Sequence, residues 1–140
     1  MEYIVYVSTA QRLMSEEELL DLLRVARAKN KKNKVTGMLL YCQGTFMQVL
    51  EGEKSSVELI YQTIELDTRH KNIIKLASGT TKKRNFPDWS MAFASVNSET
   101  LQEIEGFLSL PDVNLPNNAE HITVNMLKTF VDNNRLYISF

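Results

Sequence analysis

Gln48 is the residue of this sequence whose chemistry most needs an explanation. It lies in the run Thr45–Leu50, where Met47 and Val49 flank it and nearly every position is apolar. A buried amide must find partners for two donors and an acceptor, and each group left unpaired costs about 1–3 kcal/mol. Gln48 is therefore either satisfied by neighbouring backbone or a tyrosine hydroxyl, or directed at a ligand.

The residue patterns of common enzyme and metal sites are missing from the sequence. There is no Cys-x-x-Cys pair, and the two histidines, His70 and His121, are far apart along the chain. No phosphate-binding loop and no dinucleotide-binding glycine pattern occurs. A small phosphatase would need a phosphate cradle after the first strand, but the loop Ser8–Arg12 has no glycine to shape one. We therefore expect neither an enzyme nor a metal site.

The composition is that of one small globular domain. The chain has 140 residues, of which 44% are apolar and 24% are charged, and its formal net charge is −1. Such a chain has no overall field to attract nucleic acid or an anionic membrane. Its single cysteine, Cys42, lies in an apolar run and favours a reducing compartment. Without a signal peptide or an apolar stretch of about 20 residues, the sequence predicts a soluble, cytoplasmic protein.

Apolar runs without breakers predict five strands. The second and third form a hairpin across Gln43–Gly44, and both are apolar enough to be buried on both faces of a sheet. A polar loop, residues 80–88, separates the last two. The predicted strands are Tyr3–Ser8, Val35–Cys42, Thr45–Leu50, Ile73–Ser78 and Trp89–Val96.

Capping signals and helical spacing predict two helices between these strands and two more after them. A capping box pairs a serine with a glutamate three residues later at the start of a helix. The boxes are Ser15 with Glu18, for a helix that ends near Asn30, and Ser55 with Glu58, for a helix that ends near His70. The C-terminal helices are expected from Asn97 or Ser98 to about Ser109, and over Ala119–Val131 with Asn118 as the cap.

The order of these elements predicts an α+β fold. Two β-α-β crossovers give a ferredoxin-like βαββαββ sandwich, a five-stranded mixed sheet with two helices on one face. The C-terminal helices are expected to cover the other face, which would otherwise be bare. We assign residues 1–97 to the core and residues 98–140 to a helical cap of the same domain.

The two helices on the shared face are expected to leave a slot between them. Stripes at helical spacing face one another there: Leu22, Ala26 and Asn30 on the first helix, and Ile60, Ile64 and Asp67 on the second. Aliphatic walls with polar groups at one end suit a flat aromatic ligand. The alternative is that the two helices pack directly against each other.

Several short segments, in register from about Tyr3 to Val96, together resemble the BLUF family of blue-light sensors, which bind a flavin, normally FAD. They are Tyr6, Asn30, VTGMLLY at 35–41, FMQVLEG at 46–52, DTRH at 67–70 and RNFPDWSM at 84–91. No single motif carries the resemblance. The spacings from Tyr6 to Gln48, and from Gln48 to Trp89 and Met91, make it specific.

The resemblance implies a role for each matching residue. Tyr6 would donate an electron to the excited flavin, Gln48 would lie between Tyr6 and the N5/O4 edge, and Asn30 would bind the carbonyl and N3 edge. Trp89 and Met91 match last-strand positions whose placement relative to the flavin is debated across the family. The other implied contacts are Leu22 and Ile64 beside the ring, Phe46 in the pocket, Lys29 near the phosphates, and Asp67, Arg69 and His70 near the ribityl and phosphate tail.

Two positions depart from the family pattern. Ala26 stands where relatives can have serine, which removes a possible hydroxyl contact, and Thr63 stands where some members have arginine. The phosphate end is therefore expected to be held less tightly. Neither departure touches Tyr6 or Gln48, so we expect light to switch the Gln48 hydrogen bonds. The signal would leave through the last strand and the C-terminal helices.

The resemblance also implies partners. A short, stand-alone sensor would act on a separate downstream regulatory protein and would form homo-oligomers, and FMN or riboflavin could replace FAD because all three share the ring. Two other functions stay open here. One is a flavoprotein with redox chemistry, which would need substrate access and a defined donor. The other is a non-photoactive protein–protein interaction module in which Tyr6 and Gln48 are structural.

Overall fold

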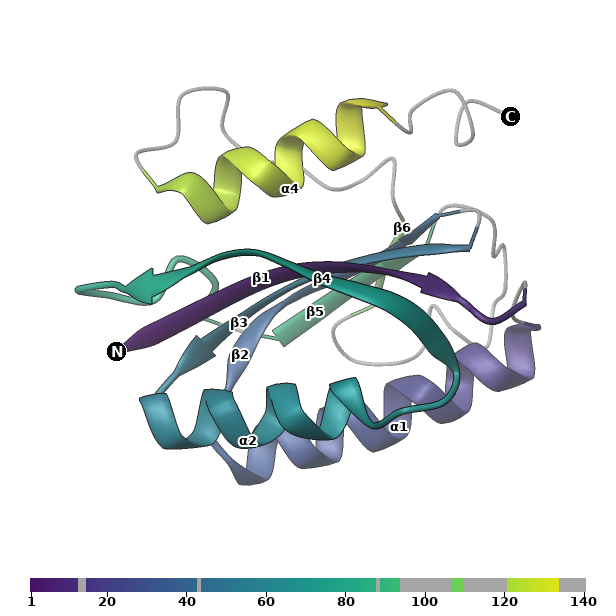
Figure 1. The fold of residues 1–140 in the computed structure, drawn as a ribbon, viewed down its shortest axis with the longest axis horizontal. Coiled ribbons are helices and arrows are strands. Elements are labelled where there is room, and N and C mark those ends of the chain that lie inside the picture. Colours follow the sequence, from purple (N-terminus) through teal and green to yellow (C-terminus); the bar gives the residue numbers. More distant parts are fainter. Residues whose placement is uncertain (13–14, 43, 88, 94–106, 110–120, 134–140) are drawn as a thin grey trace.

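The computed structural model describes residues 1–12, 15–42, 44–87, 89–93, 107–109 and 121–133. Their elements form three layers, with α1 and α2 on one face of a sheet and α4 on the other (Figure 1). In chain order they are β1 (Glu2–Ala10), α1 (Glu16–Lys32), β2 (Thr36–Cys42), β3 (Thr45–Gly52), α2 (Lys54–Glu65), β4 (His70–Thr80), β5 (Trp89–Phe93), β6 (Phe107–Ser109) and α4 (Ile122–Asn133).

The sheet has six strands in the order β4-β1-β3-β2-β5-β6. The pairs from β4 to β2 are antiparallel, whereas β5 runs parallel to β2, and β6 runs parallel to β5. The predicted α+β class and the mixed sheet are confirmed. The prediction of five strands was wrong, because Phe107–Ser109 adds an edge strand.

The hairpin of β2 and β3 forms the buried centre of the sheet, as its composition predicts. β3 pairs with β1 on one side and β2 on the other, and Phe46–Gly52 are all buried. Close packing of the two backbones requires Gly37, because a Cβ there would lie 1.8 Å from the carbonyl oxygen of Val49. With both edges paired, the hairpin gives a rigid base for the side chains of β3.

Alternation along the strands divides the core into two parts. One lies between the sheet and α2, and includes Tyr6 and Leu50. The other lies between the sheet and α4, and includes Val5, Val49 and Leu127. Since Tyr6 pairs with Gln48 in the β1–β3 register, both side chains point to the face that carries α1 and α2.

The predicted start and end of the second helix were wrong, whereas the first capping box is confirmed. Ser15 and Glu18 make both bonds of their box. The second helix starts at Lys54 after Glu53, whose side chain makes no capping bond, so Ser55 already lies within the first turn. It ends at Glu65 because the next turn leads into β4, which begins at His70.

The C-terminal predictions were partly wrong. Residues 107–109 form β6, so the helix expected to reach Ser109 does not do so. Residues 94–106 and 110–120 lie outside the described residues, and with them Asn97, Ser98, Asn118 and the predicted boundary between core and cap. The last helix is confirmed, and it runs over Ile122–Asn133 rather than Ala119–Val131.

Candidate functional site

A cavity opens between α1, α2 and the sheet, where the facing stripes predict a slot. It holds about 660 Å³ of space between atoms, including solvent at its mouth. The three walls have different sources. α1 contributes Leu22, Val25, Ala26, Lys29 and Asn30; α2 and the turn after it contribute Ile60, Thr63, Ile64, Asp67 and Arg69; the strands contribute Tyr6, Leu39, Phe46, Gln48 and His70. The alternative of direct helix packing is wrong at this position.

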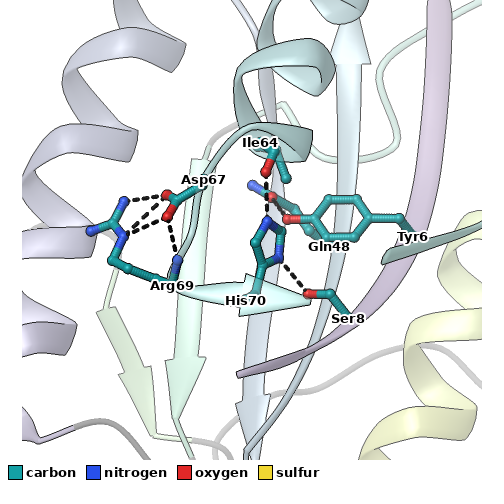
Figure 2. Close-up of polar contacts among 7 residues, drawn as sticks. All are labelled: Tyr6, Ser8, Gln48, Ile64, Asp67, Arg69 and His70. Carbon is teal, nitrogen blue, oxygen red and sulfur yellow. Dashed lines mark hydrogen bonds and ion pairs between the residues drawn. The ribbon is translucent and has the colours of Figure 1, made fainter. Parts of the chain in front are cut away.

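The wall formed by the sheet carries a short hydrogen bond between Tyr6 and Gln48. The Tyr6 hydroxyl donates to Gln48 Oε1 at 2.6 Å, and each residue is only 3% exposed (Figure 2). Their strands hold them directly opposite one another in the β1–β3 register. With Oε1 turned to the phenol, the Nε2 group of the same amide is the part that faces away from Tyr6.

Burial keeps the Tyr6 phenol in its neutral form. It raises the pKa of Tyr6 far above the ordinary value, and the negative charges that Tyr61 and Asp67 can carry raise the pKa further. The ring also meets Tyr61 edge-on, with 5.8 Å between the ring centroids. Tyr6 therefore keeps its proton at neutral pH and donates a hydrogen bond to Gln48.

Asn30 has a buried amide nitrogen that lacks a partner. It lies in the last turn of α1, is 2% exposed and lines the cavity. Among the described residues, its Nδ2 is the buried side-chain polar atom without a hydrogen bond. Leaving such a donor unpaired costs about 1–3 kcal/mol. The orphaned donor beside the Tyr6–Gln48 pair fits a ligand with a carbonyl edge, such as a flavin ring.

The far end of the cavity is polar. Arg69 donates hydrogen bonds from its Nε and NH2 groups to the Asp67 carboxylate, and its backbone N–H donates to the same carboxylate at 2.9 Å (Figure 2). Partial burial favours the neutral acid, but these hydrogen bonds and the charge of Arg69 outweigh it and lower the pKa of Asp67. The ion pair neutralises much of the Arg69 charge. Lys29, which is exposed, is the cation on the α1 side of the cavity.

His70 fixes the turn between α2 and β4 against β1. Its Nε2 lies 2.5 Å from the carbonyl oxygen of Ile64, and its Nδ1 lies 2.7 Å from Ser8 Oγ (Figure 2). A carbonyl oxygen can only accept, so Nε2 carries the proton, and in the neutral ring Nδ1 accepts from the Ser8 hydroxyl. The cavity wall at His70 is thus held from both sides.

The structure brings together all ten residues predicted to contact a flavin, since each lines this cavity. Trp89 and Met91 are placed by backbone alone. Met91 pairs with Leu39, which itself pairs with Gln48, so Met91 lies in the same cross-strand row two strands away. Sequence reasoning missed Val25 and Leu39 as lining residues. Val25 follows Leu22 at helical spacing, whereas Leu39 needed the β2–β3 register.

Two absences concern the described residues only. Within them, no group of three or more His, Cys, Asp or Glu side chains is arranged to hold a metal ion. Also within them, no helix combines the length and the apolar character that a membrane crossing requires.

Known proteins with similar sequences are light-controlled enzymes of greater length. The chain is 33% identical over 93 residues to photoactivated adenylate cyclase subunit beta of Euglena longa, and 41% identical over 71 residues to subunit alpha of Euglena gracilis. These matches cover 66% and 51% of this chain but only 11% and 7% of the relatives. The chain therefore spans about a tenth of the relatives' length.

The solved structures that match include a BLUF protein and a light-regulated cyclase. The dark-state structure of the BLUF protein BlrB matches with a TM-score of 0.62 and 29% identity, over 66% of this chain and 70% of BlrB. A bacterial light-regulated adenylyl cyclase matches with a TM-score of 0.63 and 29% identity, over 95% of this chain and 33% of that protein. The sequence model of the family described as "Sensors of blue-light using FAD" matches residues 1–92. The chain belongs to the BLUF family of blue-light sensors.

Proposed function

We propose that this chain is a blue-light receptor that binds a flavin in the cavity between α1 and α2 and is switched by the Tyr6–Gln48 pair. The observation that carries the proposal is the buried 2.6 Å hydrogen bond from Tyr6 to Gln48 on the wall of that cavity. A phenol beside an amide that can turn over is a two-state hydrogen-bond element. In an interaction module this bond would be structural alone, and the unpartnered Nδ2 of Asn30 in the same cavity favours a ligand instead.

The chain's own residues divide the binding of the flavin between them. The unpartnered Nδ2 of Asn30 would donate to the carbonyl edge of the ring, and Leu22 and Ile64 would contact its two faces. Lys29 and the Asp67–Arg69 pair would hold the polar tail. FAD is the flavin in the family's description, and FMN or riboflavin would present the same ring to Asn30.

When bound, a flavin supplies the absorption of blue light and an excited state that accepts an electron. Tyr6 would give up an electron and, as its oxidised phenol becomes strongly acidic, pass its proton to Gln48 Oε1. The amide of Gln48 would then turn over or change tautomer. After the electron and the proton return to Tyr6, the amide of Gln48 would remain in its second arrangement. The changed hydrogen bonding that Gln48 offers the ring edge would lower the absorption energy slightly.

The signal is proposed to leave through β5 and the C-terminal part of the chain to a separate regulatory protein. β5 lies beside β2, with Met91 in the same row as Gln48, and α4 packs on the opposite face of the sheet (Figure 1). We propose further that the sensor self-associates and acts on a partner protein. The relatives named as cyclases show one class of output that such a family serves.

The test is a visible absorption spectrum of the purified protein before and after a blue flash. We expect a flavin spectrum that shifts slightly to the red and relaxes in darkness, as a change of hydrogen bonding requires. Bleaching of bound flavin would instead indicate redox chemistry. A colourless protein that takes up no added flavin would leave the interaction module as the function.

A further inference from the structure

Glu51 is a fully buried acid outside the cavity. It is 0% exposed and lies three residues after Gln48 on β3, so it points to the opposite face of the sheet. Its carboxylate accepts from the backbone N–H of Asn85 at 2.8 Å, from the backbone N–H of Phe86 at 2.6 Å and from the Asn85 amide at 3.3 Å. A buried carboxyl group needs such donors to compensate its lost hydration.

Arg84 completes the attachment from the other side of the same segment. Its guanidinium donates to the Glu51 carbonyl at 2.8 Å, the Thr36 hydroxyl at 2.7 Å and the Lys34 carbonyl at 2.8 Å. Lys34 adopts a left-handed backbone conformation with φ of 54°. We refer to Glu51 together with residues 84–86 as the clamp.

The clamp is connected to both polar groups that the proposed function directs at the flavin, Asn30 and Gln48. Lys34 lies four residues after Asn30, and the backbone N–H of Val35 donates to the Asn30 carbonyl at 2.9 Å. Glu51 lies three residues after Gln48 in the same paired strand. A shift of the end of α1 or of β3 therefore reaches the same three residues.

The clamp also leads directly to the proposed output elements. Phe86 is 7% exposed and packs in the core cluster that contains Val124 and Leu127 of α4. Three residues after Phe86, Trp89 begins β5 beside Gly37 of β2. Residues 84–86 are thus attached to the pocket strands by polar bonds, to α4 by packing and to β5 by the chain itself.

We propose that Glu51 is a positioning residue that, through residues 84–86, transmits the state of the cavity to β5 and α4. The inference rests on the proposed function and adds the route by which the Gln48 switch reaches the far side of the sheet. The carboxylate fits this task because it accepts bonds from two consecutive backbone N–H groups. Segment 84–86 must follow any movement of β3.

The test is hydrogen exchange of the flavin-loaded full chain, in darkness and under blue light, with and without Glu51→Gln. In the wild type, light is expected to change exchange in peptides from 84–93 and 121–133. The glutamine keeps the size but replaces one acceptor oxygen with a donor that faces other donors. We expect the variant to keep the dark spectrum and the red shift, because Glu51 does not line the cavity, and to lose the light-induced change at 121–133.

As the control, Glu58→Gln makes the same chemical change at an exposed position on α2. It should keep the full light-induced change in hydrogen exchange. Should Glu51→Gln fail to fold, Arg84→Lys applies the same test, since it keeps the charge but cannot reach all three acceptors. If these variants keep a normal red shift and the same light-induced change in hydrogen exchange at 121–133 as the wild type, this inference alone would be overturned. A wild type without bound flavin or without a red shift would overturn the proposed function first.

Discussion

At the scale of single residues, two side chains carry the proposed photochemistry and one carries the binding. Tyr6 and Gln48 are bonded before any ligand enters, because opposite positions in the β1–β3 register hold them together. Asn30 is different, since its Nδ2 has no hydrogen-bond partner among the described residues. The Tyr6–Gln48 pair is therefore suited to switching, and the unpaired Nδ2 of Asn30 is suited to binding the ligand.

Gln48→Leu should leave flavin bound and abolish the light-induced red shift, because its amide is the part proposed to turn over. The loss of its acceptor leaves the Tyr6 hydroxyl unpaired and should also cost about 1–3 kcal/mol of unfolding free energy. The measurement is the difference spectrum after a blue flash. Gln62→Leu, at an exposed position on α2 outside this cavity, is the control and should keep the shift. A normal shift in Gln48→Leu would disprove the mechanism.

Asn30→Ala should weaken flavin binding by about tenfold, the value of one good hydrogen bond. In the flavin-free protein, the substitution should not lower the free energy of unfolding, since the Nδ2 donor has no partner to lose and its burial is itself unfavourable. Titration of the apoprotein with flavin, followed by fluorescence quenching, measures the affinity. Asn33→Ala removes the same group one turn on, where it donates to the Lys29 carbonyl, and should leave affinity unchanged. Equal affinities for Asn30→Ala and the wild type would argue against Asn30 as a flavin ligand.

At the scale of elements, the turn between α2 and β4 shapes the polar end of the cavity. The helix ends at Glu65, and Asp67 then accepts bonds from the backbone and side chain of Arg69. His70 ties the start of β4 to Ser8 on β1. Helical spacing alone extends α2 to His70, but these bonds stabilise a turn and place three side chains in the cavity wall instead.

Asp67→Asn should destabilise the protein at neutral pH and have less effect in acid. The pKa of Asp67 is lowered in the folded protein, as Arg69 outweighs the effect of burial. A lowered folded pKa adds stability above the unfolded pKa, about 3.9, and this contribution is lost as pH falls through the folded pKa. Urea unfolding of variant and wild type at pH 7 and pH 3 measures the difference. A difference that stays constant between the two pH values would contradict the assignment.

At the scale of the whole molecule, the sheet separates the face with the proposed flavin cavity from the face that α4 covers. α1 and α2 border the cavity, while α4 covers the opposite side (Figure 1). Val5, Met47 and Val49 lie on the α4 side of the same strands that carry Tyr6 and Gln48. Closely packed strands transmit small displacements between faces because the interior has little free volume.

Leu127→Ala should destabilise the protein without weakening flavin binding. Leu127 belongs to α4, is 0% exposed and packs in the core beneath that helix, and truncating a buried leucine typically costs about 2–5 kcal/mol. The cavity lies on the other face, so flavin affinity should stay within error of the wild type. Urea unfolding and flavin titration measure the two effects. Ile122→Ala on the same helix is the control and should cost little, because Ile122 is 47% exposed. A large loss of affinity in Leu127→Ala would show that the two faces are not independent in binding.

The sequence by itself determined the buried hairpin, the α+β class and the helical stripes that face the cavity. These follow from local patterns: apolar runs gave the central strands, and helical spacing put Leu22, Ala26 and Asn30 on one stripe of α1. The family resemblance then pointed to Tyr6 and Gln48 as partners. No periodicity could have joined two residues so far apart in the chain.

Only the tertiary structure decided the register, the element ends and the clamp. Pairing of Tyr6 with Gln48 and of Leu39 with Met91 depends on strand alignment, which is a non-local property. The sixth strand, Phe107–Ser109, is defined by its pairing with β5, which the local sequence does not specify. The predicted strand ends at Leu50, one residue before Glu51. The burial of Glu51 became visible only once residues 84–86, distant in sequence, were folded onto it.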